Sequence, residues 1–242
     1  KRDFFFFDLG SGSLANFNGL HLPVTATTKV FLTHLHADHV GDMPTLVWSL
    51  AKAGRRDPVE VWGPGGEVPE LGTRSYAEHL TRAHAWDTAS LNGHPGQSGA
   101  RLEVTEVPFE NTSTVYERNG VRISSFPVIH ILNGSVGYRL DYNGLSVVFS
   151  GDTRPSHTLV DACDGADLLI HEVTADEPLG HSSASQAGTI AQEAGARALG
   201  LIHYTVWNTT PAQRERLCDD ARTTFDGEVF LCEDFQEIPL RR

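Results

Sequence analysis

The 242-residue chain lacks three features that mark large classes of proteins. No window of about 18 apolar residues occurs, so we expect no membrane-spanning helix and no membrane partner. Its 3 cysteines have no paired short spacing, which argues against a disulfide framework and leaves at most one disulfide open. Its 19 Lys and Arg are outnumbered by 31 Asp and Glu, for a net charge of −12. Because binding to phosphate backbones takes clustered basic residues, this charge argues against a nucleic acid partner.

Histidine, in contrast, is abundant, with 12 residues. A chain rich in His and Asp but poor in Cys can build metal sites from nitrogen and oxygen ligands. The length fits one large domain, and we expect residues 1–242 to fold as a single domain.

The chain starts abruptly at Lys1, with neither a Met nor an apolar signal segment, so we expect the natural protein to be longer. We expect a cytoplasmic location, or a periplasmic or secreted one if a signal has been removed. A homodimer is left open.

Short apolar runs alternate with helix-length segments, which predicts a layered α/β protein. The predicted strands are Asp3–Asp8, Lys29–Thr33, Val59–Trp62, Leu102–Val107, Val121–Pro127, Val136–Tyr142, Ser146–Ser150, Asp167–His171, Ala198–His203 and Val229–Cys232. The predicted helices are Pro44–Ala53, Tyr76–Ala85, Ser156–Ala162, Ala184–Ala194 and Pro211–Thr224. Asn143-Gly144, between two predicted strands, indicates a tight hairpin.

Four potential metal ligands lie in the segment Thr33–His39, which reads THLHADH and follows a predicted strand. His34 and His36 are two residues apart and can point the same way if the chain stays extended. Asp38 and His39 can then point toward the position of a second, neighbouring metal ion. One loop could therefore supply two ligands to each of two metal ions, and the remaining ligands must come from downstream.

Further potential ligands follow apolar strands later in the chain, namely His130, Asp152, His171, Glu172 and His203. The carboxyl ends of strands at one sheet edge are where α/β proteins assemble their sites. Asp152 is suited to bridge two ions because each of its carboxylate oxygens can bind one.

These residues resemble the ligand motifs of the metallo-β-lactamase superfamily. THLHADH matches its H-x-H-x-D-H motif, and the isolated His130, SGDT (Ser150–Thr153) and His203 match its later motifs. Within the superfamily, LLIHEVT (Leu168–Thr174) followed by HSSASQA from His181 resembles the branch of ribonuclease Z, the tRNA 3′-processing endonuclease. That branch also includes arylsulfatase-like and phosphodiesterase-like hydrolases. The resemblance implies a four-layer αβ/βα sandwich, which here would lack its first N-terminal strands.

The resemblance also implies two divalent metal ions, normally zinc, with manganese or iron as alternatives. It assigns three ligands to the first ion, namely His34, His36 and His130. It assigns three ligands to the second ion, namely Asp38, His39 and His203, and Asp152 bridges the two.

His181 and Glu172 are candidate catalytic residues in addition to the metal ligands. In the ribonuclease Z branch, the matching histidine is thought to protonate the leaving group or hold the phosphoryl oxygen, and the matching glutamate orients it. The alternatives are a surface histidine near a helix N-terminus and a plain solvated carboxylate. We expect Asp38 and Asp152 to orient the nucleophile.

Three further residues are expected to support the site. Asp8 and His171 are interpreted as groups that orient the metal ligands. Asp42 could serve the same end or cap the helix that begins near Pro44.

The chain departs from bacterial ribonuclease Z, which carries an inserted flexible arm that binds the tRNA elbow. Here the stretch between Gly63 and Leu102 is short and holds few basic residues, chiefly Arg74, Arg82 and Arg101. With the acidic net charge, this favours a small anionic substrate over tRNA.

We therefore expect a binuclear metal-dependent hydrolase that cleaves a phosphodiester or sulfate ester of a small molecule by a metal-bridged hydroxide. One alternative is a tRNA 3′-processing endonuclease, and another is a di-iron redox enzyme on the same fold. A non-catalytic binding module and a lactam or lactone hydrolase are weaker alternatives.

Overall fold

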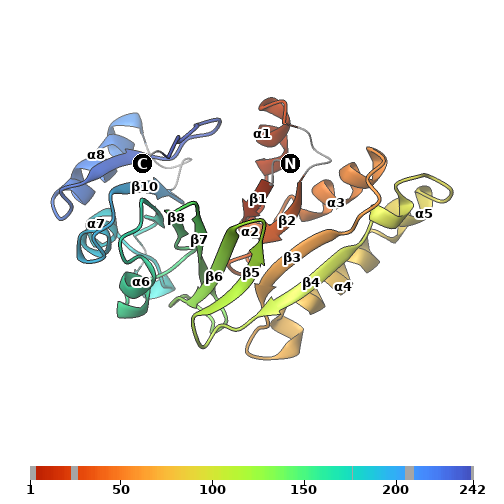
Figure 1. Ribbon diagram of the computed structural model, residues 1–242, viewed down its shortest axis with the longest axis horizontal. Helices are drawn as coiled ribbons and strands as arrows, with labels where there is room; N and C mark the ends of the chain where they lie inside the picture. Colours follow the sequence, from red (N-terminus) through yellow and green to blue (C-terminus); the bar gives the residue numbers. More distant parts are fainter. Residues whose placement is uncertain (1–3, 23–26, 176, 205–209, 241–242) are drawn as a thin grey trace. The chain divides into compact units, whose positions relative to one another are not determined.

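Two sheets organise the chain, one in each of two units that span residues 1–107 and 108–242 (Figure 1). The computed structural model describes residues 4–22, 27–175, 177–204 and 210–240. Each unit has its own sheet, helices and hydrophobic core, so the predicted α/β class is confirmed. A single domain over residues 1–242 stays a prediction.

Unit 1 contains a four-stranded sheet in the order β1-β2-β3-β4, in which every neighbouring pair is parallel. Its strands are β1 (Phe4–Phe7), β2 (Thr27–Phe31), β3 (Val59–Pro64) and β4 (Leu102–Val107). Its α-helices are α1 (Ser13–Gly19), α2 (Ala37–Val40), α3 (Met43–Lys52), α4 (Thr73–Ala83) and α5 (Ala85–Ser90). Two short 3-10 turns, η2 (Pro69–Leu71) and η3 (Gln97–Gly99), complete the connections.

The four consecutive phenylalanines of β1 form a strand that packs on both faces. Phe4 and Phe6 contact the Phe17 ring, with centroids 6.1 and 5.3 Å apart. Phe5 and Phe7 point to the opposite face and contact Phe31, with centroids 6.2 and 5.5 Å apart. A parallel strand that is covered on both sides reads as an unbroken apolar run, which explains this sequence.

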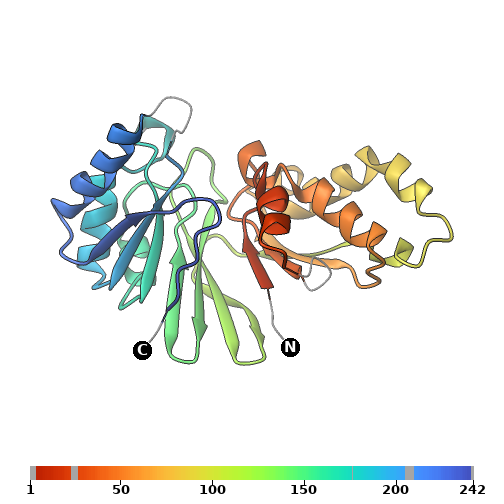
Figure 2. The ribbon, with the colours of Figure 1, turned by 90° about the horizontal axis from the view of Figure 1, so that it is seen from above.

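Unit 2 contains a seven-stranded sheet in the order β11-β10-β9-β8-β7-β6-β5. Its strands are β5 (Ser113–Arg118), β6 (Val121–Pro127), β7 (Val136–Tyr142), β8 (Leu145–Phe149), β9 (Leu168–Glu172), β10 (Ala198–Ile202) and β11 (Glu228–Leu231). The strands β5 to β8 pair antiparallel and β8 to β11 pair parallel. The helices α6 (His157–Ala162), α7 (Ala184–Glu193) and α8 (Pro211–Arg222) lie along one face of this sheet, and a 3-10 turn η4 (Glu177–Leu179) precedes α7 (Figure 2).

The Asn143-Gly144 hairpin is confirmed between β7 and β8. Both residues have positive φ, 51° and 71°, as a type I′ turn requires. In contrast, β5, α1, α2 and α5 were not predicted. They are short, and β5 reads STVYER, in which only two residues are apolar, so the alternation is too weak to indicate a strand.

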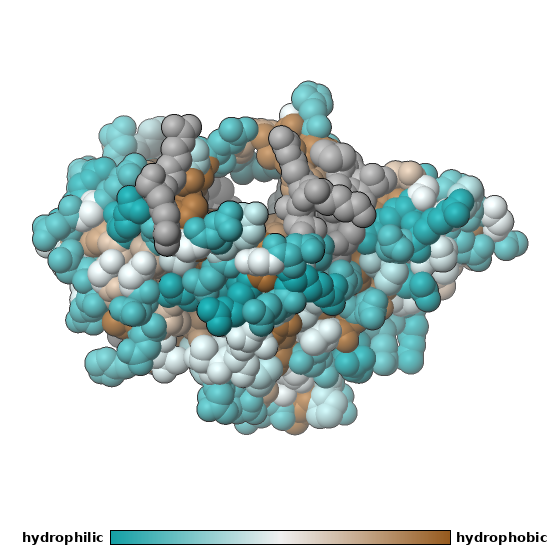
Figure 3. Space-filling view, viewed as in Figure 1, coloured by the Kyte–Doolittle hydropathy of each residue, from teal (hydrophilic) through white to brown (hydrophobic). Residues whose placement is uncertain are grey.

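No helix in the described ranges is long and apolar enough to cross a membrane. On the face drawn in Figure 3, hydrophobic residues reach the surface only in separate patches among hydrophilic ones.

The Asp42 carboxylate caps a helix, but not the one predicted. It makes no capping bond to α3, whose N-cap it occupies. Instead, it accepts hydrogen bonds from the backbone N–H groups of Gly12 and Leu14, at 3.0 and 2.9 Å, at the start of α1. A residue 28 positions away in the sequence therefore supplies the anion that the N-terminus of α1 favours.

Replacing Asp42 with Ala should destabilise the protein by about 1–2 kcal/mol, because two N–H groups and the helix dipole lose their carboxylate partner. Urea denaturation followed by circular dichroism measures the change. Glu67→Ala, which removes an exposed carboxylate of the same unit, is the matched control and should stay within about 0.5 kcal/mol. Equal stability of the two variants would contradict this role.

Candidate active site

The carboxyl ends of four strands meet at one edge of the unit 2 sheet. β8, β9 and β10 run parallel, and β6 points the same way because two antiparallel steps separate it from β8. His130 follows β6, Asp152 follows β8, Glu172 ends β9 and His203 follows β10. The sheet thus brings these four predicted site residues to the same edge.

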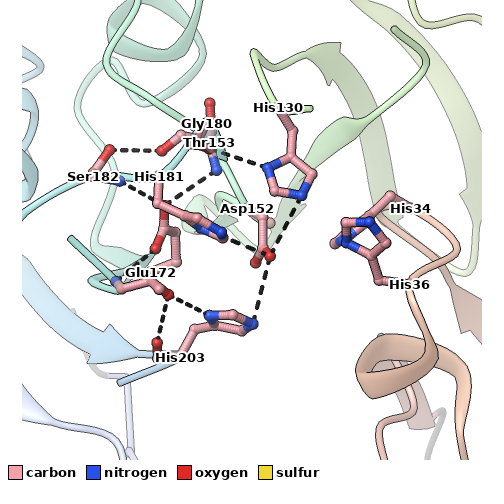
Figure 4. Close-up of polar contacts among 12 residues, drawn as sticks. His34, His36, His130, Asp152, Thr153, Glu172, Gly180, His181, Ser182 and His203 are labelled. Atoms are coloured by element: carbon pink, nitrogen blue, oxygen red, sulfur yellow. Dashed lines mark hydrogen bonds and ion pairs between the residues drawn. The ribbon is translucent and has the colours of Figure 1, made fainter. Parts of the chain in front are cut away.

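The buried carboxylate of Asp152 faces three imidazole rings (Figure 4). Its Oδ2 lies 3.9 Å from His130 Nε2, 3.5 Å from His203 Nε2 and 3.9 Å from His181 Nδ1. Ligand atoms of Asp152, His181 and His203 all lie within 4.8 Å of one another, so they could bind a single ion. His181 is buried, so the alternative of a surface histidine is wrong.

Hydrogen bonds at Nδ1 fix which nitrogen of His130 and His203 can bind a metal. His130 Nδ1 lies 3.1 Å from the Gly180 carbonyl oxygen, which can only accept, so the proton sits on Nδ1. Thr174 donates its hydroxyl hydrogen to the His203 carbonyl oxygen at 2.8 Å and therefore accepts from His203 Nδ1 at 2.6 Å. Nε2 of each ring consequently faces Asp152 and is the nitrogen that can bind a metal.

His203 adopts a left-handed backbone conformation with φ of 60°. Such a conformation is uncommon for a residue other than glycine and is often found at functional sites. The Thr174 hydroxyl bonds both the ring and the carbonyl of His203 and so holds this conformation.

The Glu172 carboxylate is buried and ties together the connections that follow β8 and β9. Its Oε1 accepts backbone N–H groups of Ser182 at 2.7 Å and Thr153 at 3.3 Å. Its Oε2 accepts the N–H of Thr174 at 2.8 Å. Its Oε1 also lies 3.3 Å from His181 Nδ1, within ion-pair distance but without hydrogen-bond alignment. The alternative of a solvated carboxylate is therefore wrong.

In unit 1, the Asp8 carboxylate organises the THLHADH loop. It accepts the backbone N–H and the hydroxyl of Thr33, at 2.7 and 2.8 Å, and His39 Nδ1 at 2.7 Å. His39 Nε2 is therefore the nitrogen that can bind a metal. Asp8 orients a predicted ligand, as expected from the sequence.

The same bonds determine the tautomers of the other two histidines. The Thr33 hydroxyl donates its only hydrogen to Asp8, so it acts as the acceptor for His34 Nδ1, at 3.0 Å. His34 Nε2 then accepts from His36 Nδ1 at 2.9 Å, so Nε2 is the nitrogen of His36 that carries no hydrogen. The rings of His34 and His39 lie 4.0 Å apart, centroid to centroid, so three imidazoles are grouped here.

Two predicted residues take less central places. The Asp38 side chain is 65 % exposed and lies 3.7 Å from His39 Nε2, at the start of α2. His171 is buried, and burial lowers the pKa of its imidazole. Its Nδ1 lies 2.6 Å from the Glu172 carbonyl oxygen, and its Nε2 has no hydrogen-bond partner among the described residues. No contact of His171 with a predicted ligand occurs among them, so its orienting role stays a prediction.

Two threonines that orient ligands were missed from the sequence. Thr33 links Asp8 to His34, and Thr174 fixes His203. The only feature of the sequence that could have indicated them is their position beside the predicted site residues. Thr33 is the first residue of THLHADH, and Thr174 is the last residue of HEVT.

Comparison with known proteins identifies the family. Residues 10–204 match the model of the β-lactamase superfamily domain. The chain belongs to this superfamily. Ribonuclease Z of Mycobacterium marinum is 28% identical over 98% of this chain and 88% of its own length. The metallo-β-lactamase fold protein YhfI of Bacillus subtilis is 22% identical with a TM-score of 0.75, covering 97% of this chain and 87% of that one. The short form of human tRNase Z is 24% identical with a TM-score of 0.73, covering 98% and 89%.

The predicted metallo-β-lactamase fold is confirmed by this membership and by the structural likeness. The predicted enzyme class, a metal-dependent hydrolase acting on ester bonds, is confirmed by the family and its ribonuclease relatives. The His and Asp groups of the site could hold metal ions, which members of this family typically bind.

The expectation that nucleic acid is not a partner is wrong. The relatives that span almost the whole chain are named ribonuclease Z, a name for enzymes that act on RNA. The expectation was based on a net charge of −12, which is an average over the whole surface. Substrate affinity depends on the local field, which metal ions can reverse at the site.

Replacing Glu172 with Ala should cost about 3 kcal/mol or more, because three buried N–H groups lose their acceptor. Glu172→Gln should cost less, since its amide oxygen can still accept at the Oε1 position. Thermal and urea unfolding measure both values. Glu193→Ala, an exposed carboxylate on α7, is the control and should leave stability unchanged. A Glu172→Ala variant as stable as this control would refute the structural role.

Proposed function

We propose that the chain is a tRNA 3′-processing endonuclease of the ribonuclease Z type. The observation that carries the proposal is the Glu172–His181–Asp152 arrangement in a chain whose ribonuclease Z relatives cover 98% of it. The small phosphodiester or sulfate ester, which net charge favoured, has no comparable support. We accordingly place the substrate among RNA phosphodiesters.

We propose that the motif residues hold two divalent ions, zinc being our first candidate. The donor chemistry fits: neutral imidazoles with oriented Nε2 lone pairs and carboxylate oxygens are the ligands that zinc, manganese and iron accept. The first ion would be held by three residues, namely His34, His36 and His130. The second would be held by three, namely Asp38, His39 and His203, with Asp152 bridging.

Divalent ions bound in this way polarise a phosphoryl group and acidify water, which favours hydrolysis at neutral pH. Asp152, held between imidazoles, and the exposed Asp38 orient the attacking water and accept its proton.

His181 supplies the proton that the leaving oxygen needs. Its Nδ1 lies near two carboxylate oxygens, Glu172 Oε1 at 3.3 Å and Asp152 Oδ2 at 3.9 Å. Glu172 is itself fixed by three backbone N–H groups, so the ring has a defined position.

Asp152→Asn and His36→Ala should each reduce cleavage of a tRNA precursor with a 3′ extension by at least about 10³-fold, because each removes a metal ligand. The assay is the release of the 3′ trailer, followed on gels with zinc or manganese supplied. His79→Ala, an exposed histidine on α4, should keep full activity. Unchanged cleavage by either ligand variant would count against the ligand assignment.

His181→Ala should reduce cleavage of the RNA by about 10²–10⁴-fold. It should have a much smaller effect on bis-p-nitrophenyl phosphate, because the p-nitrophenolate leaving group departs without a proton. Steady-state kcat on both substrates measures the difference. If both substrates suffer equally, His181 is not the proton donor.

A further inference from the structure

The two loops that carry His130 and His181 expose an unusual amount of aliphatic surface. Of the ten large hydrophobic residues that are exposed in the described chain, four lie within two positions of these histidines. They are Ile129, Ile131, Leu132 and Leu179, with 45, 49, 58 and 49 % of their surface exposed. Clustered apolar surface beside a catalytic centre indicates a binding site. We call these four residues the aliphatic rim.

The two loops are fixed to each other. His130 Nδ1 donates to the Gly180 carbonyl oxygen at 3.1 Å. A Cβ atom at Gly180 would lie 2.8 Å from His130 Cα, and its φ is 82°, so only glycine fits at this close approach. The contact between His130 and Gly180 therefore fixes the rim residues of the first loop relative to Leu179 on the second.

The first loop is also tied to the segment that carries Asp152. The N–H of Ile129 donates to Thr153 Oγ1 at 3.1 Å, and the N–H of Arg154 donates to the Ile129 carbonyl oxygen at 2.9 Å. The position of the rim relative to the Asp152 carboxylate is thus set by hydrogen bonds within unit 2. An ordered aliphatic surface loses little entropy on binding, which favours affinity.

We propose that the aliphatic rim binds the nucleobase of the nucleotide that carries the leaving oxygen. The inference rests on the proposed function and adds to it a contact with the substrate. A phosphodiester at Asp152 has a nucleoside on each side, and the base is the flat, weakly polar part of each. Leu179 lies two residues from His181, our proposed proton donor to the leaving oxygen, and on this ground we assign the rim to the nucleoside on that side.

An aliphatic surface offers no hydrogen-bond partner to a base edge. It should therefore bind every base by dispersion and apolar burial, with little preference among the four. This suits an enzyme that cleaves many RNA sequences at a position defined by structure.

The test compares Leu132→Ser and Leu179→Ser with Leu71→Ser, an equally exposed leucine in unit 1 (52 %). The ligand is an RNA spanning the scissile bond, with a methylene group in place of the leaving oxygen so that it binds without being cleaved. A second version lacks the base of the nucleotide that carries this position. Fluorescence anisotropy measures the Kd, and thermal unfolding confirms that each variant is folded.

Wild type and Leu71→Ser should bind the abasic RNA about tenfold more weakly than the intact RNA. Leu132→Ser and Leu179→Ser should bind the intact RNA about tenfold more weakly than wild type, and removal of the base should then change their Kd by less than about threefold. This loss of sensitivity to the base is the signature of a direct contact.

Three results would overturn the inference. In the first, the rim variants weaken intact and abasic RNA by the same factor. In the second, only removal of the base on the other side of the scissile bond matters. In the third, Leu132→Ser converts a dimer to a monomer in analytical ultracentrifugation without changing RNA affinity, so that the rim is a contact between two copies. Failure of the proposed function looks different: wild type then hydrolyses bis-p-nitrophenyl phosphate but neither binds nor cleaves RNA.

Discussion

One buried carboxylate, that of Glu172, holds the site of unit 2 together. Three backbone N–H groups from the connections that follow β8 and β9 converge on it, and His181 lies beside it. A buried charge is tolerated only when it is surrounded by donors, so the loops must adopt these positions for the protein to be stable. Stability and chemistry thus depend on the same group, because the bonds that satisfy Glu172 also place Asp152 and His181.

Unit 1 uses the same device with Asp8. Its carboxylate accepts hydrogen bonds from Thr33 and from His39 Nδ1. The Thr33 hydroxyl in turn accepts from His34 Nδ1 and so fixes the orientation of that ring. In both units, a hydrogen bond at Nδ1 leaves Nε2 as the nitrogen that can bind a metal, for His39 here and for His130 and His203 in unit 2. This consistent choice of tautomer is what a set of metal ligands needs, and a set of unrelated polar histidines would have no reason to share it.

The sequence was sufficient for the α/β class, most strand positions and the motif residues, because apolar periodicity and ligand spacing are local properties. It failed where the answer depends on long-range contacts. Asp42 was expected to cap the following helix but caps α1, and Glu172 could have been a solvated carboxylate. The net charge gave a wrong prediction about nucleic acid as a partner, because it averages over the whole surface, whereas binding depends on a few local groups. The aliphatic rim could not be predicted from the sequence, because the exposure of Leu132 and Leu179 depends on the tertiary structure.

The central claim is our proposal that the motif histidines and aspartates hold two divalent metal ions. The most direct measurement is the number of divalent ions bound per chain, determined by inductively coupled plasma mass spectrometry after dialysis against buffer with a weak chelator. We predict two ions in the wild-type protein, and fewer in both His34→Ala from unit 1 and His203→Ala from unit 2, with each variant folded. Full metal content in either variant, or a wild-type protein that retains no ion, would contradict the account.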